Sequence, residues 1–166
     1  MVRRKIIWCL LGIMCFANVS STNKCDFDKI NNVMVRNLGP DTAQIILSAD
    51  SIVAHLIVWE KDTLPCKTLS LCESAIVKYT MCQPVMYLKD KRMYSGFYAD
   101  VKLVFIKENT FITLELDYNI NKWRLIDENG EQKCRHDLRN GELLTLFREL
   151  WPESENIKIK YDEFTE

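Results

Sequence analysis

Alternation of apolar and polar residues in the second half of the chain is the feature that most limits its fold. Segments 111–118 and 122–126 both alternate in this way, and the apolar run 98–106 precedes them. A period of two places one side of a strand on a core and the other in water. Asn129-Gly130 then predicts a type I′ hairpin turn. At least four consecutive antiparallel strands are therefore predicted between residues 98 and 135.

The rest of the chain predicts shorter elements. Helices are expected at 27–38 and 141–151, and further strands at 45–47, 52–59, 75–81, 85–88 and 157–161. A single helix over 43–59 is an open alternative to two strands there. The predicted fold class is mainly β, a β-rich α+β domain: an antiparallel barrel or sandwich with short N- and C-terminal helices.

The first residues have the composition of a secretory signal peptide. Three basic residues precede an apolar run from 6 to 16, and small or polar residues follow to 22. This run is well short of the ~20 residues of a membrane-spanning helix, so no membrane span is predicted. Residues 1–21 are expected to be removed, leaving 22–166 as a single secreted, extracellular domain. The Asn18 glycosylation sequon is retained only if cleavage follows Ala17 rather than Ser21.

Charge and cysteine content narrow the function further. The net charge of −1 becomes −4 without residues 1–21, which gives no basic field for nucleic acid. The disulfide candidates that remain are Cys25, Cys66, Cys72, Cys82 and Cys134. Their odd number predicts either two bridges and one thiol or a disulfide-linked dimer. A bridge from Cys82 to Cys134 is favoured because its long loop would restrict the unfolded chain.

Motifs for catalysis or metal binding are missing from the sequence. The cysteine spacings match no zinc site, and no phosphate-binding or nucleophile motif is present. Of the two histidines, His55 is expected in the core and His136 in solvent. Glu115 and Asp117 are expected on a solvated strand face. The chain is therefore predicted to be non-enzymatic, with no cofactor and no metal.

Aromatic and methionine residues are numerous and suggest an interior binding site. A closed sheet of about eight strands can hold one small ligand lined by every second residue. The candidate ligand-binding residues are Trp59, Phe105, Leu114, Leu116, Tyr118 and Trp123.

Residues 105–164 resemble the end of a lipocalin. The similarity consists of the hairpin from 111 to 125, the helix 142–150 and a closing strand at 156–161. The Gly-x-Trp of the first lipocalin strand has no counterpart. The resemblance implies a β-barrel that carries or sequesters a small apolar ligand, and some lipocalins act on host defence.

An extracellular protein is the alternative partner. A secreted protein–protein interaction module would then act through its surface, as an immune-modulating effector or receptor decoy built on a β-sandwich or an MHC class I-like platform. A helical cytokine is a further alternative if 27–38 and 43–59 are both helices.

Overall fold

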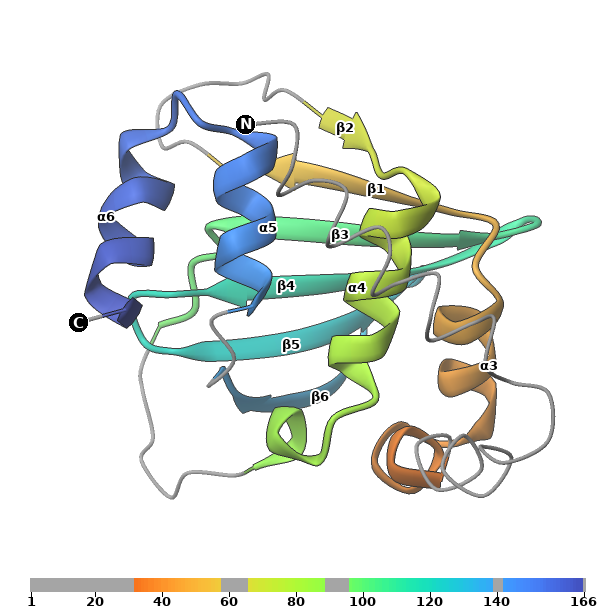
Figure 1. Ribbon diagram of the computed structural model, residues 1–166. Coiled ribbons are helices and arrows are strands. Elements are labelled where there is room, and N and C mark those ends of the chain that lie inside the picture. The colour runs from red at the N-terminus through yellow and green to blue at the C-terminus, as the bar shows by residue number, and fades with distance from the viewer. Residues whose placement is uncertain (1–31, 58–65, 89–95, 139–141, 166) are drawn as a thin grey trace, which may run out of the picture.

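One six-stranded antiparallel sheet, in the order β2-β1-β3-β4-β5-β6, forms the centre of the protein (Figure 1). The computed structural model describes residues 32–57, 66–88, 96–138 and 142–165. The strands are β1 (Ser51–Leu56), β2 (Cys66–Thr68), β3 (Val101–Lys107), β4 (Thr110–Asp117), β5 (Lys122–Asp127) and β6 (Gln132–Asp137). The helices are α3 (Pro40–Ser48), α4 (Leu71–Met81), the 3-10 helix η1 (Pro84–Tyr87), α5 (Glu142–Leu150) and α6 (Glu155–Thr165), and residues 32–38 are also helical.

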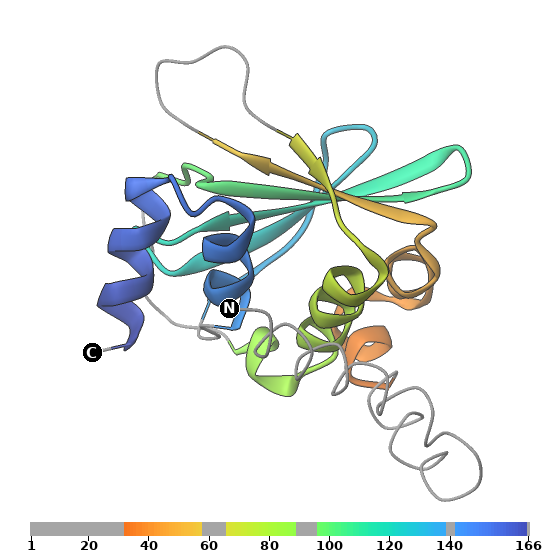
Figure 2. The same cartoon turned by 45° about the horizontal axis from the view of Figure 1, so that its top comes forward.

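The helices gather on one face of the sheet (Figure 2). The apolar core lies between them and the sheet, which is a mixed α+β arrangement. The predicted antiparallel sheet is confirmed, but the sheet is not closed into a barrel and ends at β2 and β6. Because helices cover the apolar face, burial of that face does not require the sheet to close on itself. No helix in the described ranges is long and apolar enough to cross a bilayer.

The hairpin between β5 and β6 differs from the predicted type I′ turn. Only Gly130 has a positive φ, +80°, whereas a type I′ turn needs positive φ at two residues. The Asp127 side chain accepts hydrogen bonds from the Asn129 and Glu131 backbone N–H groups, at 3.0 and 2.8 Å. This carboxylate stabilises an alternative turn, in which only the glycine takes the left-handed conformation.

The predicted strand at 45–47 is wrong, since these residues lie in α3. Pro40 occupies the first turn of α3, where its fixed φ suits a helix, and Gly39 before it has a φ of +83°. Ala43 and Ile46, one turn apart, are buried. The single-helix alternative over 43–59 is also wrong, because the chain enters β1 at Ser51.

The strands predicted at 75–81 and 85–88 are wrong as well. Residues 75–81 belong to α4, which begins with a capping box: the Ser70 hydroxyl accepts from the Glu73 N–H, and the Glu73 carboxylate accepts from the Ser70 N–H. These two hydrogen bonds favour a helix over the predicted strand. Residues 85–88 lie mainly in η1, which Pro84 opens.

The predicted helix at 141–151 is confirmed by α5, whereas the strand predicted at 157–161 is wrong. Those residues lie in α6, whose Ile157, Tyr161 and Phe164 face the core at helical spacing. Ile159, which seemed to continue a period of two, is 52% exposed. The closing strand of the lipocalin resemblance is therefore a helix here. Of the helix predicted at 27–38, residues 32–38 are helical and 27–31 lie outside the described residues.

Candidate functional site

The candidate ligand-binding residues lie in the core. Five of the six candidates lie within the described residues, on the side of the sheet that faces the helices. Each of these five is at most 3% exposed: Phe105, Leu114, Leu116, Tyr118 and Trp123. Trp59 lies outside the described residues. The structure thus brings five of the six candidates onto one buried layer.

These side chains pack against neighbouring elements of the protein. The Trp123 indole N–H donates to the Met86 carbonyl at 2.7 Å, and its ring lies 4.9 Å from that of His136. The Tyr118 ring meets Phe147 of α5 and Phe164 of α6 at 6.5 and 6.2 Å. The prediction that His136 is solvated is wrong, because this aromatic packing buries it.

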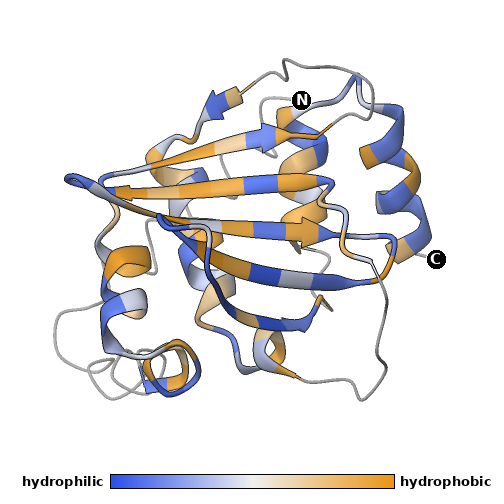
Figure 3. Cartoon of the chain, turned by 180° about the vertical axis from the view of Figure 1, so that it is seen from behind, coloured by the Kyte–Doolittle hydropathy of each residue, from blue (hydrophilic) through white to orange (hydrophobic). Residues whose placement is uncertain are grey.

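The opposite side of the sheet, called the open face below, carries no helix of the described chain (Figure 3). Along β1 and β3, residues with partly exposed side chains alternate with the buried core residues. Several are large and apolar, and they form an apolar patch of Val53, Val104, Ile106, Phe111 and Ile126. Phe111 is 40% exposed. The other four are partly buried, and a cluster of exposed and partly exposed apolar groups can form an interaction surface.

A row of four charged side chains and one histidine, called the charged row below, borders this patch. It crosses five strands through directly opposed residues, and consists of His55, Lys102, Glu115, Arg124 and Arg135. This charged row lies two residues along each strand from Val53, Val104, Thr113 and Ile126. His55, expected in the core, is half-buried on the open face.

Glu115 is the central anion of the charged row. Its carboxylate lies 2.7 Å from the Lys102 ammonium and 2.7 Å from the Arg124 guanidinium. Burial alone would raise the pKa of Glu115, but the hydrogen bonds from these two cations outweigh burial and hold its pKa below the ordinary value. The solvated position predicted for Glu115 is wrong, since the side chain is only 5% exposed.

Phe97 lies against the arginine end of the charged row. Its ring centroid is 4.2 Å from Arg124 Cζ and 5.4 Å from Arg135 Cζ. Such stacking covers a flat side of a guanidinium and leaves its N–H edges for hydrogen bonds. Arg135 Nη2 is buried and has no hydrogen-bond partner among the described residues. Arg124 therefore shares its charge with Glu115, whereas Arg135 has no carboxylate partner among the described residues.

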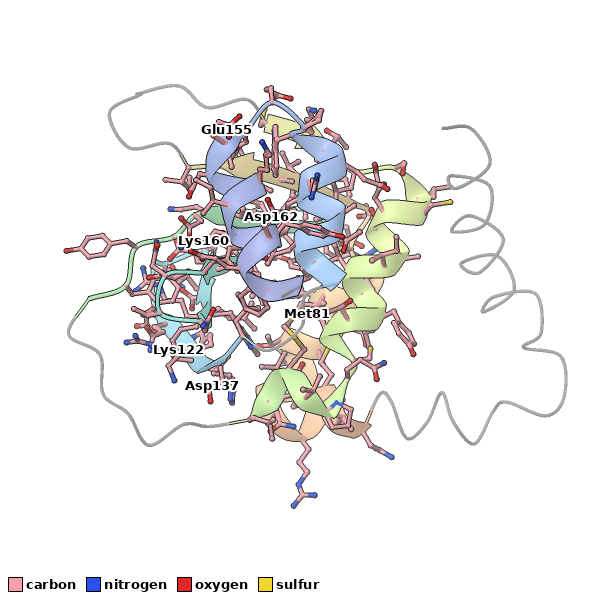
Figure 4. The ribbon with its side chains drawn as sticks, turned by 60° about the vertical axis from the view of Figure 1, so that its left-hand side comes forward. Met81, Lys122, Asp137, Glu155, Lys160 and Asp162 are labelled. Carbon is pink, nitrogen blue, oxygen red and sulfur yellow. The ribbon has the colours of Figure 1, made fainter. Side chains whose placement is uncertain are left out.

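A second, buried row of charge holds Phe97 in place. Asp117, Lys122 and Asp137 are directly opposed on β4, β5 and β6, and Lys122 forms an ion pair with Asp137 (Figure 4). Asp117, also predicted to be solvated, is 1% exposed because backbone groups surround its carboxylate. It accepts the Tyr98 N–H at 2.7 Å, which fixes the residue next to Phe97.

Thiol chemistry gives no comparable site in the described chain. Burial raises the pKa of Cys82 to about 11, so its thiol stays protonated at neutral pH. Cys66 is exposed, and both Cys66 and Cys82 are free thiols here, so Cys82 is not bridged to Cys134 in this structure. Cys25 lies outside the described residues, and the pairing of the cysteines stays a prediction. No group of three metal-ligating side chains occurs in the described ranges.

Sequence reasoning missed the open face as a site. The alternation in 122–126 placed Lys122 and Arg124 on one side of a strand, but it did not indicate which residues of the neighbouring strands lie opposite them. Phe97 carried no signal, because its position depends on how the segment before β3 crosses the sheet. In comparisons with known proteins, no family model matches the chain, and no curated protein or solved structure does either.

Proposed function

We propose that the protein is a secreted, non-enzymatic binding protein that engages an extracellular protein through the open face of its sheet. The observation that carries this proposal is the apolar patch beside the charged row. Five large apolar side chains lie together on a face that no described helix covers. Burying such a patch against a partner would contribute about 25 cal/mol for each Å² of apolar surface.

The interior carrier for a small apolar ligand has less support. Two of its candidate residues, Tyr118 and Trp123, already contact α5, α6 and η1, and a ligand beside them would have to displace those contacts. The sheet is also open, so the enclosed site that the lipocalin resemblance implies has no barrel around it. The surface-binding alternative needs no such rearrangement.

Photo-crosslinking from two matched positions tests the proposal. Benzoylphenylalanine replaces either Phe111 on the open face or Tyr79 on α4, which are 40% and 51% exposed. The full-length chain, secreted from cells, is then irradiated with extracellular fluid and cell surfaces from its own source. We expect position 111 to label one protein saturably. Excess unlabelled chain should compete, and Ile106→Glu should abolish the labelling because it places a charge in the apolar patch.

Three results would contradict the proposal. Equal labelling from positions 79 and 111 would show that the contact is unspecific. Labelling from 111 that survives Ile106→Glu would show that the patch does not matter. A lipid-sized 1:1 adduct in native mass spectra, without labelling from either position, would favour the interior carrier.

A further inference from the structure

We infer that the open face recognises an extended acidic segment of a partner protein, one that presents a large apolar side chain and a carboxylate two residues apart on the same side. This inference rests on the proposed function and specifies its partner. The apolar residue would contact the apolar patch, and the carboxylate would meet Arg124 and Arg135.

The charged row has a surplus of positive charge. The row contains one carboxylate, that of Glu115, and three cations: Lys102, Arg124 and Arg135. Lys102 and Arg124 share that carboxylate and remain 40% and 28% exposed, while Arg135 forms no ion pair with the described residues. An incoming carboxylate would offset this surplus through ion pairs with the partly exposed side chains of Lys102, Arg124 and Arg135.

The distance between the apolar patch and the charged row matches the spacing of side chains on an extended partner segment. The charged row and the row through Val104 and Ile126 are two residues apart, which is about 7 Å along a strand. Side chains two residues apart on an extended partner have the same separation and the same direction. An extended segment running nearly along the strands, as in aligned sheet packing, therefore places one side chain over each row.

Other occupants fit less well. In a two-fold contact the open face would meet its own copy, so the surplus cations of each row would face an equally cationic surface. A sulfated polysaccharide would neutralise the cations but has no large apolar group to cover Phe111 and Ile106. An acidic segment with an apolar side chain satisfies both rows.

Binding of defined β-hairpin peptides to the secreted full-length chain tests the inference by fluorescence polarisation. One hairpin presents Phe and Glu two residues apart on one face, and its match carries Gln in place of Glu. We expect the Glu hairpin to bind at least ten times more tightly than the Gln hairpin. Arg135→Gln should weaken its binding about fivefold, and Arg135→Lys should weaken it less. Lys158→Gln, the same charge change on α6, should leave it unchanged.

Other outcomes would overturn the inference. In the peptide assay, these are failure of both hairpins to bind, equal binding of the two, and equal effects of Arg135→Gln and Lys158→Gln. Two further results would point to another occupant. Tighter binding of heparin than of the Glu hairpin would indicate a polysaccharide, and a dimer in solution that Arg135→Gln dissociates would indicate a second copy of the chain. Thermal melts of each variant show that it is folded. If crosslinking from position 111 succeeds while the hairpins fail, the acidic partner is wrong and the open face remains the binding surface. If both fail, the proposed function is wrong too.

Discussion

Replacing Lys122 by methionine is expected to destabilise the protein by about 3–5 kcal/mol. Lys122 and Asp137 form an ion pair whose side chains are 7% and 6% exposed, and Asp117 lies directly opposite Lys122 on β4. Without the ammonium group, a buried carboxylate loses its counter-charge, and desolvation makes that costly. Urea denaturation of the two proteins measures the difference in the free energy of unfolding.

Two further variants make this prediction specific. Lys158→Met removes the cation of an exposed pair with Glu155 and should change the free energy of unfolding by less than about 0.5 kcal/mol. Lys122→Met combined with Asp137→Leu removes the buried ion pair and should recover part of the loss, since Asp117 keeps its backbone N–H donors but not the ammonium opposite it. A Lys122→Met protein within about 1 kcal/mol of the wild type would show that the pair is not buried as described.

Trp123→Ala is expected to cost a similar amount, about 3–5 kcal/mol. The indole is fully buried between β5 and η1, and its N–H satisfies the Met86 carbonyl. Truncation would leave both a cavity and an unsatisfied acceptor. The same urea titration measures the loss. A residue that lined an empty ligand cavity would instead lower ligand binding with a small change in stability.

Phe111→Ala is the matched control on the other face of the sheet. Because Phe111 is 40% exposed, its truncation should cost no more than about 1 kcal/mol. Trp123→Ala and Phe111→Ala would then separate the two faces by their effect on stability. Equal losses from the two substitutions would contradict the assignment of Trp123 to the core and of Phe111 to the open face.

The sequence predicted an element correctly where the spacing of its apolar residues indicated the right type of element. Apolar and polar residues alternate in the sequence of β4 and in most of β5, and α5 places its apolar residues on one side. The failures fall where the period was misread. In 157–161 three apolar residues at a spacing of two suggested a strand, yet Ile157, Tyr161 and Phe164 define a helical face. The capping box at Ser70 and Glu73 was a readable signal for α4.

The open face could be predicted only in part. Alternation shows that a strand has two faces, but not whether a second layer covers each one. That depends on where α3, α4, α5 and α6 pack, which involves contacts far apart in the sequence. The pairing of Glu115 with Arg124 likewise depends on the register set by the turn at 118–121, and that of Arg124 with Arg135 on the next turn. Residue types alone do not determine those registers.

Solvent relaxation of methyl signals tests most directly whether one face of the sheet is open. A soluble gadolinium chelate broadens the NMR signals of methyl groups that solvent reaches. We predict broadening of Val104 and Ile106 and protection of Leu103, which immediately precedes Val104 on β3 and is fully buried. Equal protection of all three would mean that a second layer covers the sheet, and would contradict the proposed binding surface.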